Sequence, residues 1–192
     1  MTIERHSALQ GHYNVGKTGI LGPDGSVGVI LEEVPNLEMH QVAAWANTLD
    51  KVGRKAADSV GADSAPGPCQ SEFGSSGSIL RIEPLKWWLH GAGASLLELN
   101  PEDGAAMDIS HSRTQIRITG ARAEEFLNRF LPLDFRQGAF PEGSVASSFI
   151  HHVGVTLWRS KEGYELFIPR GFALAIWEGL VEVAQQFGLE IR

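Results

Sequence analysis

Cysteine is nearly absent from this sequence, which has one among 192 residues, Cys69. A single thiol cannot form an internal disulfide, and there is no CxxC motif or Cys/His cluster to bind zinc. A chain of this length needs neither, because it can bury about 70% of its unfolded surface on folding. Since the cysteine usage gives no sign of an oxidising compartment, we expect a cytoplasmic protein.

Long apolar runs and blocks of basic residues are also missing. No stretch approaches the ~20 apolar residues of a membrane span, and Met1–Gln10 lacks the apolar run of a secretion signal. The chain has 16 Lys and Arg against 23 Asp and Glu, a formal net charge of −7. Because contacts with phosphates dominate the affinity for nucleic acid, this balance argues against DNA or RNA. We therefore expect no membrane and no nucleic acid among the partners.

What remains is an ordinary globular composition, 43% hydrophobic and 20% charged, which suits one compact domain built from two halves. Residues 1–25 are predicted to form an N-terminal arm that closes in the turn Gly22–Gly25. Residues 26–112 form the first half, in which strand-like runs surround one helical pattern. Strands are expected at 26–34, 39–45, 78–83, 85–90 and 105–110, a helix at 48–60 stopped by Gly61, a short helical segment at 94–99 and an exposed loop at 63–77. For 39–45, a helix that begins earlier fits nearly as well.

The second half, residues 113–192, repeats this order more clearly. Thr114, Ile116 and Ile118 fall on one face with polar residues between them, which is typical of a half-buried strand. Further strands are expected at 145–151, 153–159 and 164–168, and amphipathic helices at 121–131 and 171–187. The sequence therefore predicts an α+β protein of two consecutive ferredoxin-like βαββαβ units with antiparallel sheets.

Two glycine-rich segments resemble binding or catalytic motifs without matching them. Gly91-Ala92-Gly93 begins like a dinucleotide-binding loop, but Leu96 occupies the third small position and no βαβ unit surrounds it. Gly74–Ser78 misses the G-x-S-x-G pattern by one place and lies in a loop. We interpret the first as a turn and the second as a linker.

The segment Asp108–Ser112 contains the residue types of a hydrolytic triad. On a strand, Asp108 and Ser110 share a face while His111 points to the other, so the imidazole cannot easily reach the serine. We expect these side chains to cap local backbone groups instead. Alternation likewise sends His151 and His152 to opposite faces, one toward the core or a partner and one to solvent, so they would not share a metal.

Trp87 and Trp88 are neighbours on a predicted strand, so one faces the core and the other the opposite face. The second tryptophan is covered either by a partner protein or by a second layer of this chain, and both interpretations stay open. Arg113 and Arg117 share a face of the predicted strand at 114–119, where they are either solvated or paired with an acidic partner or a pterin tail.

Five segments between Leu80 and Arg159 carry a family resemblance. They are Leu80–Leu89 (LRIEPLKWWL), Asp108–Arg113 (DISHSR), Gly120–Arg129 (G-x-x-A-x-x-F-L-N-R), Leu131–Asp134 (LPLD) and His151–Arg159 (HHVGVTLWR). On these residues, roughly the last 110 of the chain resemble the gamma subunit of heterotetrameric sarcosine oxidase. The D-x-S and G-x-x-A-x-x-F-L patterns are also distantly similar to the folate-binding domain of the glycine-cleavage T-protein, which fits a doubled α+β fold.

The resemblance implies a subunit of a complex that converts sarcosine, tetrahydrofolate and oxygen into glycine, 5,10-methylenetetrahydrofolate and hydrogen peroxide. In that family FAD, FMN, NAD and tetrahydrofolate belong to the alpha and beta subunits and zinc to delta. We therefore expect alpha, beta and delta partners and no catalytic, cofactor-binding or metal-binding residue on this chain. The acidic pair by which the T-protein contacts folate is absent from the corresponding segment His151–Gly154.

Three functions are therefore considered. The first is a non-catalytic gamma subunit that stabilises the oxidase complex. The second is the equivalent subunit of a related dehydrogenase acting on N-methylglutamate. The third is a stand-alone protein that binds folate or another small ligand in the cleft between its halves.

Overall fold

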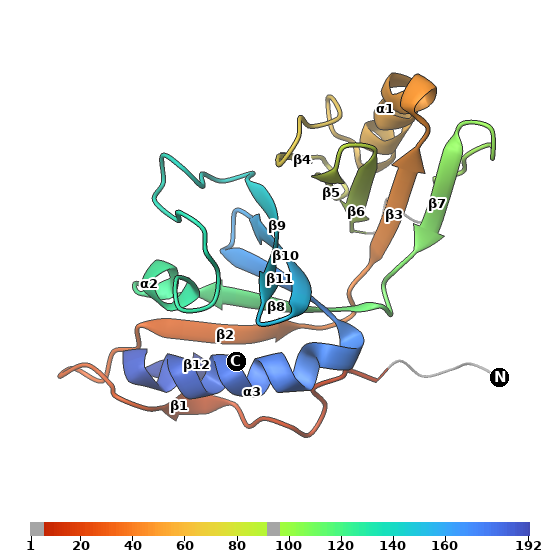
Figure 1. Ribbon diagram of the computed structural model, residues 1–192. Helices are drawn as coiled ribbons and strands as arrows, with labels where there is room; N and C mark the ends of the chain where they lie inside the picture. The colour runs from red at the N-terminus through yellow and green to blue at the C-terminus, as the bar shows by residue number, and fades with distance from the viewer. Residues whose placement is uncertain (1–5, 92–96) are drawn as a thin grey trace.

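The computed structural model describes residues 6–91 and 97–192, which form two β-sheets and three α-helices (Figure 1). The strands are β1 (Gly16–Thr18), β2 (Val29–Val34), β3 (Met39–Ala44), β4 (Ser71–Phe73), β5 (Ser78–Glu83), β6 (Lys86–His90), β7 (Gly104–Asp108), β8 (Arg113–Thr119), β9 (Val145–Ile150), β10 (Val153–Arg159), β11 (Tyr164–Pro169) and β12 (Leu189–Ile191). The helices are α1 (Leu49–Val60), α2 (Ala123–Leu127) and α3 (Ala173–Ala184), with short 3₁₀ turns η1 (Ala46–Thr48), η3 (Arg170–Phe172) and η4 (Gln185–Phe187).

The five-stranded sheet has the order β4-β5-β6-β3-β7, and its neighbouring strands are antiparallel. In chain order, β3, β5, β6 and β7 are the first to fourth strands of one unit, and α1 follows β3. In the sheet, the first strand, β3, lies between the third, β6, and the fourth, β7, which is the ferredoxin-like arrangement. Of the helical segment expected at 94–99, residues 94–96 lie outside the described residues, and residues 97–99 belong to no helix or strand.

The seven-stranded sheet has the order β1-β12-β2-β8-β11-β10-β9. It repeats the same arrangement with β8, β10, β11 and β12, but β2 is inserted between β12 and β8. β2 pairs with β8 in antiparallel register and with β12 in parallel register. The first predicted half, 26–112, thus contributes a strand to the second sheet, and the division into 1–25, 26–112 and 113–192 stays a prediction.

Three hydrophobic clusters fill the spaces between four layers of structure. The first lies between α1 and the five-stranded sheet and includes Val52, Ala56 and Trp87. The second lies between the two sheets and includes Trp88 and Phe167. The third and largest packs α2 and α3 against the other face of the seven-stranded sheet. Each sheet therefore buries both of its faces over part of its area.

β8 shows why a period of two was visible in the sequence. Thr114, Ile116 and Ile118 are buried, as predicted. The opposite face was expected to be polar and exposed to solvent. Gln115 is instead 1% exposed and Arg117 is half-buried, because the five-stranded sheet covers this face. This burial of polar side chains places the candidate site between the sheets.

The two tryptophans of β6 settle the alternative that the sequence left open. Trp87 is 1% exposed and packs under α1, while Trp88 is 3% exposed and meets Phe167 edge-to-face, with ring centroids 5.7 Å apart. A second layer of this chain covers Trp88. The interpretation of one tryptophan as a partner surface is therefore wrong for the chain as described.

Several short elements differ from the prediction. Three-residue strands β1 and β4 lie in the expected arm and in the expected loop 63–77, and β12 was not predicted. α2 is shorter than the expected 121–131. Gly61 does end α1, in the left-handed conformation with φ 69°. No helix in residues 6–91 and 97–192 is long and apolar enough to cross a membrane.

Candidate functional site

A buried carboxylate lies where the two sheets meet. Glu165 of β11 is 0% exposed, and its cross-strand neighbour on β8 is Arg117. The Arg117 Nε donates to Glu165 Oε1 at 2.7 Å, and the Gln115 Nε2 donates to Glu165 Oε2 at 2.8 Å. Since an uncompensated buried charge is costly, these donors explain how a glutamate is tolerated in this position.

Ser160, in the loop between β10 and β11, adds the third donor. Its Oγ donates to Glu165 Oε1 at 2.9 Å and accepts the backbone N–H groups of Glu162 and Gly163, each at 3.1 Å. The same loop brings the Glu162 carboxylate into an ion pair with Arg117. The serine hydroxyl is thus occupied by loop-closing contacts, which is a structural role rather than that of a nucleophile.

The junction also connects the two sheets directly. His90 of β6 and Gln115 of β8 form a side-chain hydrogen bond of 3.0 Å between Nε2 and Oε1. The ring centroids of His90 and Trp158 are 5.6 Å apart, and Lys161 Nζ lies over the Phe73 ring, 4.6 Å from its centroid. These residues line a cavity of about 250 Å³, which we call the junction cavity.

The electrostatics of the junction favour a fixed ion pair. Burial lowers the pKa of the Arg117 guanidinium, but the hydrogen bond and charge of Glu165, with the charges of Glu162 and Glu32, raise the pKa overall. Arg117 therefore stays charged. Glu165 accepts three hydrogen bonds, from two residues of β8 and from the loop between β10 and β11, so the junction fixes these elements to one another.

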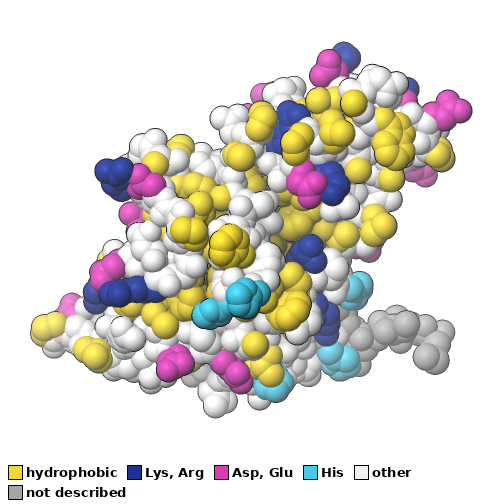
Figure 2. All heavy atoms as spheres, viewed as in Figure 1, with side chains coloured by type: hydrophobic (Ala, Val, Ile, Leu, Met, Phe, Trp, Pro, Cys, Tyr) yellow, Lys and Arg dark blue, Asp and Glu magenta, His cyan; other side chains and the backbone are white. Residues whose placement is uncertain are grey.

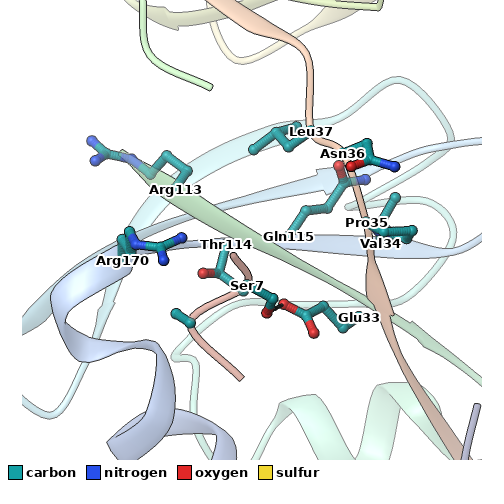
Figure 3. A pocket seen from close by; sticks show the side chains of 11 residues that line it. Ser7, Glu33, Val34, Pro35, Asn36, Leu37, Arg113, Thr114, Gln115 and Arg170 are labelled. Carbon is teal, nitrogen blue, oxygen red and sulfur yellow. Dashed lines mark hydrogen bonds between the residues drawn. The ribbon is translucent and has the colours of Figure 1, made fainter. Parts of the chain in front are cut away.

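A second cavity, of about 190 Å³, adjoins the junction and shares Gln115 with it. Figure 3 places Arg113 and Arg170 at one end of this pocket and Glu33 at the other, with Thr114 between them. The walls come from β2 and its connection to β3, from β8, from η3, and from the N-terminal arm. We call it the arginine pocket.

The two arginines predicted to form a row on β8 have different surroundings. Arg117 pairs within this chain, so its interpretation as solvated or as bound to an acidic partner is wrong. Arg113 lies over the Trp88 ring, 5.4 Å from the centroid, and donates to the Ser112 carbonyl oxygen at 3.1 Å. Burial lowers the pKa of the Arg113 guanidinium.

The segment Asp108–Ser112 has the capping role expected of it. Ser110 Oγ accepts the Met39 N–H at 2.9 Å and donates to the Met39 carbonyl oxygen at 3.2 Å, while Asp108 Oδ1 accepts the Ser110 N–H at 2.8 Å. The side-chain and backbone hydrogen bonds from Ser110 lower the pKa of Asp108. His111 is exposed. These contacts join the end of β7 to β3 rather than forming a triad.

His151 and His152 form the two-residue turn between β9 and β10, and both are exposed. The expectation that one points into the core or a partner assumed a continuous strand, and it is wrong for the core because the chain reverses here with φ 53° at His151. Gly74 and Gly77 close the turn between β4 and β5 through a 2.8 Å backbone hydrogen bond, so this segment is a hairpin. In the motif Gly91-Ala92-Gly93, only Gly91 lies within the described residues, and it directly follows β6.

Sequence reasoning missed Glu165, Gln115 and Arg170 as residues of interest. Only one local signal was present: Glu165 interrupts an otherwise apolar strand, and a charged residue in a buried strand needs a partner. Among the described residues, no group of three or more His, Cys, Asp or Glu side chains is placed to hold a metal ion.

No protein-family model matches the chain. Among curated proteins, the sarcosine oxidase subunit gamma of Arthrobacter sp is 28% identical over 81 residues, which are 42% of this chain and 40% of that protein. The aminomethyltransferase of Thermoanaerobacter pseudethanolicus is 24% identical over 108 residues, 55% of this chain and 27% of the relative. The aligned regions thus span less than half the length of these curated relatives.

Two solved structures share the fold. A chain of the heterotetrameric sarcosine oxidase from Corynebacterium sp. U-96, in complex with pyrrole 2-carboxylate, matches with a TM-score of 0.69 at 19% identity, over 83% of this chain and 85% of that one. The glycine cleavage system aminomethyltransferase T from Bartonella henselae matches with a TM-score of 0.59 at 14% identity, over 91% of this chain and 52% of that one. The predicted α+β fold with antiparallel sheets is confirmed. The chain resembles the gamma subunit of sarcosine oxidase and, in fold and in part of its sequence, the aminomethyltransferases.

Proposed function

We propose that this chain is the gamma subunit of a heterotetrameric sarcosine oxidase located in the cytoplasm. The observation that carries the proposal is the coverage of the structural matches. The sarcosine oxidase chain is matched over 85% of its length, whereas only 52% of the aminomethyltransferase is matched. A subunit of similar extent is a better counterpart than one domain of a larger transferase.

In this proposal the chain stabilises the complex and carries no catalytic residue. The polar groups at the junction support this role, because Glu165, Arg117 and Ser160 are engaged with one another. The complex would convert sarcosine, tetrahydrofolate and oxygen into glycine, 5,10-methylenetetrahydrofolate and hydrogen peroxide. FAD, FMN, NAD and tetrahydrofolate would lie on the alpha and beta subunits, and zinc on delta.

Contacts with the other subunits require exposed apolar surface, and the outer strands of both sheets offer it. Met107 on β7 is 63% exposed and Phe149 on β9 is 59% exposed. In the view of Figure 2, hydrophobic side chains are spread over the visible face of the molecule, with Lys and Arg side chains among them. Large exposed apolar side chains are typical of interfaces. We assign the partner contacts to these edge strands.

The test is to purify the tagged chain from its native cells under gentle conditions and to identify the chains that elute with it. The proposal predicts three further subunits in constant proportion, at least one of them much larger than this chain. A protein that elutes alone, at the mass of a single chain, contradicts the proposal.

A further inference from the structure

β7 is the outer strand of the five-stranded sheet and pairs with β3 on one side only (Figure 1). Just beyond the end of β7, the Ile109 N–H donates to the Met39 carbonyl oxygen at 2.9 Å, so Ile109 bonds toward β3. Antiparallel strands bond to a given neighbour through alternate residues. In the observed register Met107 therefore also bonds toward β3, whereas Ala106 and Asp108 direct their backbone groups away from the sheet.

The outward backbone groups of β7 are open to another chain. Ala106 and Asp108 together present two N–H and two C=O groups at this edge, and in residues 6–91 and 97–192 none of the four is bonded to a loop or to a side chain. All residues of β7 after Gly104 are exposed. The methyl side chains of Ala105 and Ala106 leave the edge accessible to another backbone.

The other edges are partly covered or guarded. β4 and the start of β9 meet edge to edge, where the Ser71 N–H donates to the Gly143 oxygen at 2.7 Å and the Val145 N–H donates to the Cys69 oxygen at 2.9 Å. β1 is only three residues long and carries Lys17, and lysines commonly protect exposed edges. β7 has neither a lysine nor a proline, and no strand covers it in the part of the chain that the structure describes.

An open edge of this kind is complementary to an extended segment, whose own N–H and C=O groups continue the ladder. We propose that an extended segment of a partner subunit adds to β7 as a further strand, with backbone hydrogen bonds to Ala106 and Asp108. Met107, which is 63% exposed, would then pack against an apolar side chain of the added strand. The inference rests on the proposed function, because the segment belongs to one of the other subunits.

Amide hydrogen exchange of the wild-type chain, free and in the purified complex, tests the inference directly. The amides of Ala106 and Asp108 should exchange at least about tenfold more slowly in the complex, because each gains a hydrogen-bond acceptor. The amide of Met107 bonds to β3 in both states and should change much less. This alternation distinguishes an added strand from a surface that merely covers β7.

A proline at the edge tests the same contact by substitution. Ala106→Pro removes one outward N–H and no bond to β3, so the chain should still fold, with a melting temperature close to that of the wild type. It should reduce the yield of co-purified subunits at least about tenfold, because the ring blocks the added strand. Ala106→Thr keeps the N–H and is the matched control, which should assemble as the wild type does.

Two results would overturn the inference and leave the gamma-subunit proposal standing. One is a wild-type yield of partner subunits with a folded Ala106→Pro variant. The other is equal exchange of the Ala106 and Asp108 amides in the free chain and in the complex, and this result decides the matter even if the variant fails to fold. A wild-type chain that elutes without partners contradicts the proposed function and this inference together.

Discussion

At the scale of single residues, Glu165 bonds to side chains from several segments of the chain, which its own sequence neighbourhood does not predict. It accepts from Gln115, Arg117 and Ser160, and Gln115 in turn bonds to His90 of the other sheet. Gln115 and Arg117 are separated from Glu165 by 50 and 48 positions in the sequence. No periodicity within one segment predicts such a contact, because periodicity reports only which face of a strand is buried.

Replacing Glu165 by Gln should destabilise the fold. The variant keeps the shape of the side chain but removes the negative charge that Arg117 and two further donors require, and we expect a loss of about 2 to 4 kcal/mol in the free energy of unfolding. Urea denaturation measures it. Glu190→Gln removes the partner of Arg192 at the surface, where solvent screens the pair, and should destabilise the fold much less than Glu165→Gln. Equal costs for the two variants would show that the junction is not a buried ion pair.

Asp108 should contribute to the acid sensitivity of the fold. Because hydrogen bonds from Ser110 lower the pKa of folded Asp108, its stabilisation is present above the unfolded pKa of about 3.9 and is lost as the pH falls through the folded value. Asp108→Asn should therefore flatten the decline of the free energy of unfolding below about pH 4. Chemical denaturation at a series of pH values is the measurement. A decline as steep as that of the wild type would mean that the Ser110 contact has no energetic effect.

At the scale of elements, sequence patterns predicted the helices and strands whose formation depends on a single segment of the chain. The alternation in β8, the 3.6-residue period of α1 and its stop at Gly61 all correspond to observed elements. β1, β4 and β12 were missed because three residues are too short to show a period. The insertion of β2 between β8 and β12 depends on pairing across more than 150 positions, which no segment of the sequence encodes by itself.

Two substitutions distinguish Gly61, where the fold requires a glycine, from Gly179, where it does not. In α3, a Cβ added at Gly179 meets nothing within 4 Å, so Gly179→Ala should raise the free energy of unfolding by about 0.5 to 1 kcal/mol through helix propensity. Gly61 has φ 69°, and a Cβ there would lie 2.2 Å from Ser75 Oγ. Gly61→Ala should therefore destabilise the chain by about 1 kcal/mol or more. Thermal unfolding compares the two, and changes of the same sign would contradict this account of α1 and α3.

At the scale of the whole molecule, two sheets each shield one face of the other, and the edges of the pair remain open. The two tryptophans, one of which the sequence offered as a partner contact, are inside, at 1% and 3% exposure, and Met107 and Phe149 on the edge strands are among the exposed apolar side chains. The family resemblance could be recognised from local motifs. The partner surface could not, because exposure is a property of the assembled layers.

Charges placed on the edge strands should disrupt assembly without unfolding the chain. We expect Met107→Lys and Phe149→Lys to reduce the yield of co-purified subunits at least about tenfold, because a buried lysine without a partner is costly at an interface. The free energy of unfolding of the isolated chain should change by less than about 0.5 kcal/mol. Gln186→Lys, which adds the same charge at an exposed position after α3, is the control. Unchanged yields for both edge variants would place the contacts elsewhere.

The central claim is that this chain is part of a flavin-containing oxidase. The most direct measurement is the visible absorption spectrum of the complex purified through a tag on this chain, recorded without oxygen before and after addition of sarcosine. The account predicts flavin bands that bleach with sarcosine and return with oxygen. A colourless preparation, or flavin bands that sarcosine leaves unchanged, would contradict it.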